Sequence, residues 1–120
     1  MKGPDIEFAE HLAKGALHIQ RCSSCGRHVF YPRLACPHCG RAELEWCRAS
    51  GRGTVYAVSI VNRRAEKGGP YNVVLVELDE GPRMMSRVVG VEHDAVRIGM
   101  PVRCRIEGAP EAPVVVFEAT

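Results

Sequence analysis

Hydrophobic residues near the start of the chain recur with the period of a helix. Four of them fall on one helical stripe: Ile6, Ala9, Ala13 and Ala16. Asp5 is suited to cap the start of a helix, and Gly15 is suited to end one. The pattern therefore predicts a short helix from Asp5 to Lys14.

The next segment, from Leu17 to about Cys47, has few apolar residues and is rich in cysteine, proline, glycine and arginine. Short strand-like pieces occur at Leu17–Arg21 and His28–Tyr31. Segments below about 40 residues with so little core usually depend on a metal ion, a disulfide or a partner. We expect one of these to hold the segment together.

Beyond Gly51-Arg52-Gly53, β-branched runs separated by turn residues continue to the end of the chain. Asp79-Glu80-Gly81-Pro82 forms a tight turn, Asn62–Tyr71 a longer charged loop, and His93–Ile98 is suited to one helical turn. The runs predict five strands: Val55–Val61, Asn72–Leu78, Arg83–Val89, Pro101–Glu107 and Val114–Glu118.

Five short strands with little helix between them are typical of a small Greek-key barrel, and the partly open OB type suits their number and length. In the strand Pro101–Glu107 apolar and charged residues alternate, which places Cys104 on the inward face. The predicted fold class is therefore mainly β. A helix and a cysteine-rich module occupy residues 1–50, and a five-stranded OB-fold barrel occupies residues 51–120.

Composition excludes several classes of protein. A length of 120 residues leaves no room for two full-sized domains, and 46% hydrophobic with 25% charged residues is typical of a folded globular chain. The net charge of +2 is too small to predict nucleic-acid binding by itself. No apolar run approaches the roughly 18 residues that span a membrane, so we expect a cytoplasmic protein.

Four cysteines in two close pairs are the strongest chemical signal in the sequence. Cys22 and Cys25 form one pair, Cys36 and Cys39 the other, and a glycine follows each pair. Two cysteines three residues apart on a tight turn can direct both sulfur atoms at one ion. The arrangement predicts a tetrahedral site of four thiolates, with zinc favoured over iron. Two disulfides, or four reduced thiols in an ordinary loop region, are the remaining alternatives.

A closed set of four protein ligands leaves no coordination position for water or substrate, so this metal is predicted to be structural. His28 and His38 lie nearby but are not needed as ligands. The other thiols, Cys47 and Cys104, have no local base, and the sequence contains no nucleophile elbow or phosphate loop. These features indicate a chain without catalytic residues; an iron-based electron carrier or a thiol catalyst is the enzymatic alternative.

The order of these elements resembles the DUF35 family of acyl-CoA-associated OB-fold proteins with a rubredoxin-like zinc ribbon. The resemblance covers nearly the whole chain. It rests on the helix, the paired cysteines with Tyr31-Pro32 between them, Val73–Leu78 running into the Asp79–Pro82 turn, Ile98–Val102, and Val116-Phe117.

The resemblance implies an accessory subunit that carries no catalytic residue. It would bind structural zinc, dock on an enzyme that acts on acyl-CoA, and help form the acyl-CoA site or channel in a hetero-oligomer. A thiolase is the expected partner. A MaoC-type enoyl-CoA hydratase or a retro-aldolase of steroid or fatty-acid breakdown is the alternative.

The basic loop after the first barrel strand is the candidate for contact with CoA. Arg63, Arg64 and Lys67 could meet its phosphates, or could form a solvated loop balanced by Glu66. The same two interpretations apply to Arg83, Arg87, Arg97, Arg103 and Arg105.

Binding of single-stranded nucleic acid is the alternative from another functional class, because OB folds and zinc ribbons both serve it. Such proteins stack bases on exposed aromatic residues along a basic groove. This chain has only three Phe, three Tyr and one Trp, and Trp46, Phe30 and Tyr31 lie near the ribbon. We therefore expect no nucleic-acid partner.

Overall fold

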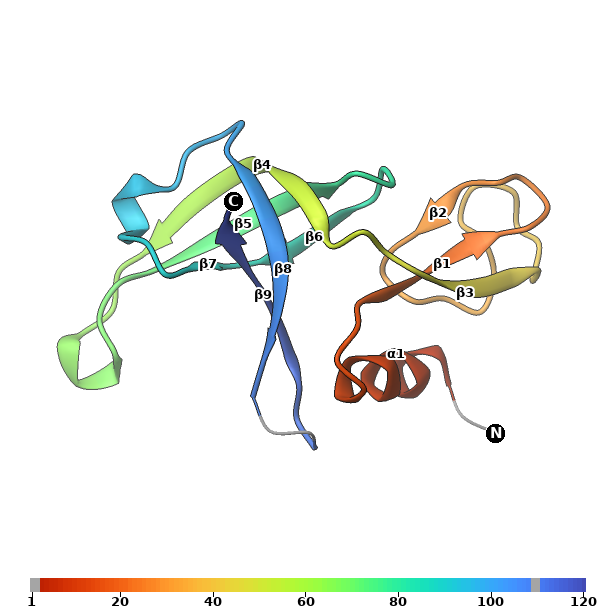
Figure 1. Cartoon of the computed structure of the whole chain (residues 1–120), viewed down its shortest axis with the longest axis horizontal. Coiled ribbons are helices and arrows are strands. Elements are labelled where there is room, and N and C mark those ends of the chain that lie inside the picture. Colours follow the sequence, from red (N-terminus) through yellow and green to blue (C-terminus); the bar gives the residue numbers. More distant parts are fainter. Residues whose placement is uncertain (1–2, 109–110) are drawn as a thin grey trace.

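Two β-sheets and one helix make up the described part of the chain (Figure 1). The computed structural model describes residues 3–108 and 111–120. A three-stranded sheet has the order β2-β1-β3, and a six-stranded sheet has the order β6-β5-β4-β8-β9-β7. The two sheets lie along the long axis of a molecule that measures 46 × 31 × 22 Å.

Helix α1 (Pro4–Ala13) forms where the sequence predicts a helix, but it buries a different face. Leu12 is buried, and Phe8 packs against the core. These two large side chains, four residues apart, remove more apolar area from water than alanines could. The predicted stripe is wrong, because three of its members lie in solvent: Ile6, Ala9 and Ala13.

The start of α1 also differs from the prediction. Gly3 is the N-cap and Pro4 is the first helical residue, while Asp5 lies inside the first turn and caps nothing. Proline suits this position because its fixed φ is already helical and its missing N–H has no partner there anyway. The predicted stop is confirmed, since the helix ends before Gly15, whose φ is 89°.

The smaller sheet has three strands, although the sequence pattern indicated two. Its central strand β1 (His18–Cys22) pairs antiparallel with β2 (His28–Val29) and with β3 (Leu44–Arg48). β3 has no strict alternation of buried and exposed residues. It becomes a strand because β1 pairs with it over its whole length, a contact that no local pattern reveals.

The larger sheet has the predicted barrel strands, with one broken in two. The third predicted strand, Arg83–Val89, is interrupted at Arg87. The six elements are β4 (Arg52–Val61), β5 (Tyr71–Leu78), β6 (Arg83–Ser86), β7 (Val88–Val89), β8 (Pro101–Glu107) and β9 (Val114–Ala119). Two short 3-10 turns, η1 (Ala65–Lys67) and η2 (His93–Ala95), lie in the predicted loop and at the predicted helical turn.

The break at Arg87 lets the sheet curl into an OB-like, partly open barrel. β6 pairs antiparallel with β5, whereas β7 pairs parallel with β9 at the opposite edge. Since Arg87 alone separates β6 from β7, the two edge strands of the sheet are consecutive in the chain. The sheet therefore bends until its two edges meet in one segment.

A buried amide side chain supports the short strand β7. The Asn72 Nδ2 donates to the Val88 carbonyl at 2.9 Å, and the Val88 N–H donates to the Asn72 Oδ1 at 2.7 Å. On the other side of the strand, the Phe117 N–H donates to the Arg87 carbonyl at 2.9 Å. Neighbouring residues of a strand direct their backbone groups to opposite sides, so the Val88 N–H and carbonyl point away from the side on which Arg87 bonds to Phe117. The Asn72 side chain gives them the two hydrogen bonds that another strand would otherwise supply.

Strand β4 begins three residues earlier than predicted because its first residues pair on both sides. Gly53 lies opposite Leu78 in β5 and Val102 in β8. A Cβ at Gly53 would lie 2.7 Å from the Glu77 carbonyl oxygen and 2.7 Å from the Val76 side chain. Glycine therefore permits the close approach of strands at this crossing.

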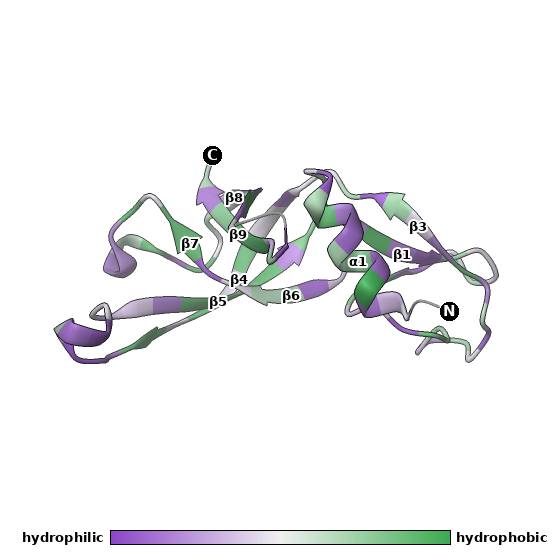
Figure 2. Ribbon diagram, turned by 90° about the horizontal axis from the view of Figure 1, so that it is seen from below, coloured by the Kyte–Doolittle hydropathy of each residue, from purple (hydrophilic) through white to green (hydrophobic). Residues whose placement is uncertain are grey.

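One hydrophobic core crosses from the helix and the small sheet into the barrel. Leu12, Leu17, Ile19 and Ala49 belong to the same buried cluster as Val55, Val76, Val102 and Phe117. In Figure 2 hydrophobic positions lie along the strands and on α1, while the tip of the β4–β5 hairpin is hydrophilic. The shared core holds the small sheet in one orientation on the barrel.

Aromatic residues attach the helix to the small sheet. Phe8 meets Phe30 edge-to-face at 5.5 Å between ring centroids and lies 6.4 Å from Trp46. The Trp46 Nε1 donates to the Glu7 carboxylate at 2.6 Å.

The described helices are all too short and too polar to cross a membrane.

Candidate metal centre and adjoining surfaces

The two cysteine pairs form two turns with the same backbone geometry. In the first, the Gly26 N–H donates to the Cys22 carbonyl at 2.8 Å, and the Cys22 N–H to the Arg27 carbonyl at 2.9 Å. In the second, Gly40 and Cys36 make the equivalent bonds, each 2.8 Å long. Gly26 and Gly40 have φ values of 80° and 79°, in the left-handed region that glycine adopts without strain.

These turns bring the four sulfur atoms together. All four Sγ atoms lie within 4.8 Å of one another. The Cys22 and Cys39 Sγ atoms are 3.6 Å apart, and those of Cys25 and Cys36 are 3.7 Å apart. Four sulfurs at about 2.3 Å from a tetrahedral zinc ion would be separated by about 3.8 Å. The donor set therefore fits a tetrahedral metal ion in number, chemistry and spacing.

Backbone N–H groups favour thiolates at this site. The Cys25 N–H points at the Cys22 Sγ over 3.5 Å, and the His38 N–H at the Cys36 Sγ over 3.4 Å. Burial works against ionisation of Cys36, but the N–H groups of Cys39 and His38 together with the thiols of Cys25 and Cys39 outweigh it and lower its pKa to about 7. At Cys39 the N–H of Arg41 favours the thiolate, while burial and the neighbouring thiols raise the pKa to about 11.

The metal end of the ribbon has its own small apolar cluster, separate from the main core. Cys22, Val29 and Cys36 are buried together with Leu44 packed against them. Cys25 and Cys39 face solvent. A cluster this small contributes little burial energy to the two turns, so an ion bound by the four sulfurs would supply the main cross-link between them. His28 and His38 stay outside the sulfur cluster, as expected from the sequence.

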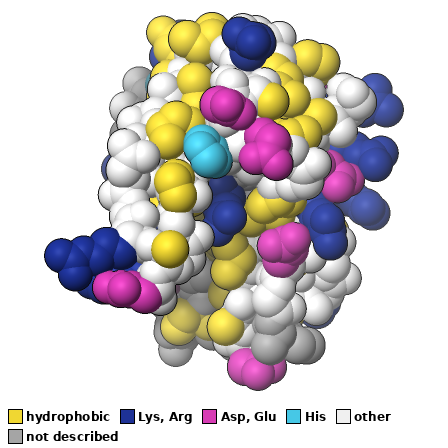
Figure 3. Space-filling model, turned by 90° about the vertical axis from the view of Figure 1, so that its left-hand side faces the viewer, with side chains coloured by type: hydrophobic (Ala, Val, Ile, Leu, Met, Phe, Trp, Pro, Cys, Tyr) yellow, Lys and Arg dark blue, Asp and Glu magenta, His cyan; other side chains and the backbone are white. Residues whose placement is uncertain are grey.

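The basic loop predicted to contact CoA lies at the tip of the β4–β5 hairpin. Arg63 donates to the Gly69 carbonyl at 2.7 Å and lies over the Tyr71 ring at 4.5 Å, and Arg64 pairs with Glu66 at 3.6 Å. Lys67 forms no ion pair within the described residues. Basic and acidic side chains project side by side from this end of the molecule (Figure 3).

The other five arginines discussed from the sequence are all surface residues. Arg83 pairs with Glu77 at 3.0 Å and lies over the Tyr56 ring at 3.7 Å. Arg103 and Arg105 both reach Glu118. Arg87 and Arg97 are exposed. The pairs between exposed charges contribute little to stability and keep the outer barrel surface polar.

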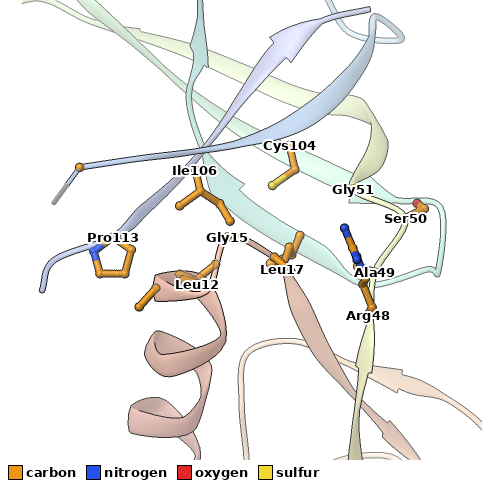
Figure 4. Close-up of a pocket in the computed structure, with 13 residues that line it drawn as sticks. Leu12, Gly15, Leu17, Arg48, Ala49, Ser50, Gly51, Cys104, Ile106 and Pro113 are labelled. Carbon is orange, nitrogen blue, oxygen red and sulfur yellow. The ribbon is translucent and has the colours of Figure 1, made fainter. Parts of the chain in front are cut away.

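The two remaining thiols differ from reactive cysteines. The Cys47 Sγ contacts the Ile19 carbonyl at 3.5 Å, and burial raises its pKa. Cys104 packs against the main core, as its predicted inward orientation implies, and lines a hollow of about 410 Å³ beside α1 and the β3–β4 linker (Figure 4). Burial raises the Cys104 pKa to about 11, which keeps the thiol neutral at physiological pH.

A second hollow, of about 520 Å³, lies between the ribbon loops and the β5–β6 turn and was not predicted from the sequence. Arg27 and Arg33 line it from the ribbon, and Pro82 lines it from the barrel. These residues are far apart in the chain. In the sequence, this hollow is indicated only by basic residues on either side of the cysteine pairs.

Comparison with known families decides the assignment. The family model described as "ChsH2, rubredoxin-like zinc ribbon domain" matches residues 9–45, and "ChsH2, C-terminal OB-fold domain" matches residues 46–107. The chain belongs to this DUF35 family. Its fold is therefore a rubredoxin-like zinc ribbon with an N-terminal helix, followed by an OB-fold domain.

Relatives of this family member include longer proteins. It is 38% identical over 104 residues to a probable enoyl-CoA hydratase alpha subunit of Thermomonospora curvata, covering 84% of this chain and 33% of that protein. It is 40% identical over 86 residues to a DUF35 domain-containing scaffold protein of Methanocaldococcus jannaschii, covering 68% of this chain and 61% of that protein. The chain thus spans about a third of the length of the first relative and about three fifths of the length of the second.

Among solved structures, this family member matches a chain described as Ltp2-ChsH2(DUF35) aldolase. The TM-score is 0.86 at 34% identity, and the match covers 99% of this chain and 96% of that chain. The similarity extends over both the ribbon and the barrel.

Proposed function

We propose that this chain is a non-catalytic accessory subunit that docks on an enzyme acting on acyl-CoA. Cys22, Cys25, Cys36 and Cys39 would hold one zinc ion, and their number leaves no coordination position open. The ion supplies structural cross-linking only: it joins the two turns and stiffens the ribbon. Four reduced thiols are expected in a reducing compartment, which agrees with the proposed cytoplasmic location.

The observation that carries this proposal is the combination of a closed four-sulfur site with a core shared between ribbon and barrel. Together they make a small rigid body, and rigid surfaces lose little conformational entropy on binding a partner. Cys47 and Cys104, the thiols outside the metal site, are kept neutral by burial, so neither is poised as a nucleophile. These features support a binding role over a catalytic one.

The names of the relatives guide the choice of partner. One is called a hydratase alpha subunit, another a scaffold protein, and the solved neighbour an aldolase. A hydratase or an aldolase is therefore the first partner to test. A thiolase, the partner expected from the family resemblance, is the alternative.

Co-expression tests the proposal directly. The chain is produced together with a hydratase, an aldolase or a thiolase from the same genome, and each mixture is examined by size-exclusion chromatography and native mass spectrometry. We expect a stoichiometric complex and an altered KM of the partner for its acyl-CoA. Migration of the chain alone in every pairing would refute an accessory role.

Metal analysis of the same preparation tests the ribbon. We expect one zinc per chain and no colour. A red protein with a visible absorption band would instead indicate iron and electron transfer.

A further inference from the structure

The hollow of about 520 Å³ between ribbon and barrel is lined by two arginines and two histidines from the ribbon loops. Figure 1 shows the β5–β6 turn reaching toward the end of β2, where this hollow lies. Arg27 and His28 come from the first cysteine turn, Arg33 from the following loop, and His38 from the second cysteine turn. Only the fold brings these four residues to one place.

The two arginines are available to a ligand. Within residues 3–108 and 111–120, neither Arg27 nor Arg33 forms an ion pair, and both are exposed. The Arg27 guanidinium lies 3.3 Å from the His38 Nδ1, which orients it. A guanidinium without a carboxylate partner retains donors for an incoming phosphate.

The backbone beneath both arginines is held in place. Gln20, which is 5% exposed, donates from Nε2 to the Arg33 carbonyl at 2.9 Å and accepts from the Arg33 N–H at 2.7 Å. The Arg27 carbonyl accepts from the Cys22 N–H at 2.9 Å. Binding here would therefore immobilise side chains on a backbone that is already ordered, which lowers the entropic cost.

The acidic residue at this hollow, Glu80, is directed toward the linker. Its Oε2 accepts from the Ser50 N–H at 2.7 Å, and its Oε1 is buried. The remaining walls include the apolar surfaces of Phe30, Pro37 and Pro82. The hollow therefore combines two unpaired guanidinium groups with apolar walls, which suits an anion attached to a flat or apolar group.

We propose that this hollow binds the phosphate groups of coenzyme A. The inference rests on the proposed function, which brings an acyl-CoA to this chain, and it names a contact site different from the predicted loop of Arg63, Arg64 and Lys67. Two of those three side chains are already engaged, Arg63 with Gly69 and Tyr71 and Arg64 with Glu66. Arg27 contacts the neighbouring His38 ring, and neither Arg27 nor Arg33 pairs with a carboxylate among the described residues.

Titration of the zinc-loaded full chain with free CoA, followed by amide NMR shifts, tests the site. We expect the largest shifts at residues 26–28, 33, 80 and 81, which all carry an amide N–H and line the hollow. CoA and dephospho-CoA should both bind, because both carry the diphosphate, and pantetheine should bind at least tenfold more weakly. Inorganic phosphate alone should bind weakly, since it lacks the group that contacts the apolar walls. Raising the salt concentration should weaken CoA binding.

Variants locate the contact. Arg27→Ala and Arg33→Ala should each weaken CoA binding about tenfold, the usual loss for a charge-assisted hydrogen bond. Arg41→Ala is the matched control, because Arg41 holds the same place in the second cysteine turn that Arg27 holds in the first and does not line the hollow. The affinity of Arg41→Ala for CoA should stay within twofold of that of the original chain.

Three results would overturn the site: shifts confined to residues 63–67, equal affinities for all three arginine variants, or no binding at millimolar CoA. Each can occur while the chain still forms a complex with an acyl-CoA enzyme. The failure of this site is therefore distinguishable from the failure of the accessory role.

Discussion

Replacing Asn72 with alanine tests the account of how the barrel closes. The side chain makes two hydrogen bonds to the backbone of Val88, and both partners are buried. Alanine removes these bonds and leaves the N–H and carbonyl of Val88 without partners on that side of β7. Each unsatisfied buried group costs about 1–3 kcal/mol, so the two groups together should lower the free energy of unfolding by about 2–6 kcal/mol. That is a large part of the roughly 5–15 kcal/mol typical of a folded domain.

Urea denaturation monitored by circular dichroism measures this loss, with excess zinc present in all samples so that metal binding contributes equally. The control is Asn62→Ala, which changes an exposed asparagine in the loop before η1 and should shift the unfolding free energy by less than about 0.5 kcal/mol. A loss below about 0.5 kcal/mol for Asn72→Ala, at an unchanged m value, would contradict the reasoning. It would show that β7 does not depend on the amide.

Three further predictions concern the metal, the strand crossing and the buried thiol. Cys36→Ser should release zinc, measured by metal analysis, and abolish partner binding while leaving the strand signal of the barrel largely intact; Cys47→Ser, outside the site, should do neither. Gly53→Ala should lower the unfolding free energy by about 1–3 kcal/mol, because the added methyl meets two atoms at 2.7 Å; wild-type stability would contradict the close approach of strands. Burial raises the Cys104 pKa from 9.0 to about 11, so the unfolded chain loses this proton at a lower pH than the folded chain. The free energy of unfolding should therefore fall between about pH 9 and 11. Cys104→Ala should lessen that fall, and a variant with the same pH profile as the original chain would contradict the burial of this thiol.

The metal site was predictable from sequence because its geometry is local. Two cysteines three residues apart, followed by a glycine with positive φ, form each turn without help from distant residues. The sequence also predicts that the two turns meet, because one tetrahedral ion takes four ligands and each turn supplies two sulfurs. The barrel strands were predictable for a similar reason, since turn residues and alternation mark their ends, and β8 lies where the pattern placed it.

Errors arose wherever a residue's role depends on its neighbours in space. The helix was predicted correctly, but its buried face was not, because the stripe of Ile6 and alanines competes with Phe8 and Leu12 for contacts that only the packed structure decides. The strand β3 forms only beside β1. The division into residues 1–50 and 51–120 and the contact of Arg63, Arg64 and Lys67 with CoA stay predictions.

The chain's sequence alone determined a four-sulfur metal site, a short helix and a run of barrel strands, because each depends on residues a few positions apart. Tertiary structure decided the face that α1 buries, the use of Asn72 as a substitute strand, and the meeting of Arg27 and Arg33 beside Pro82. These features join residues that are distant in the chain, and the spacing of residues along a sequence carries no information about which distant segments will pack together.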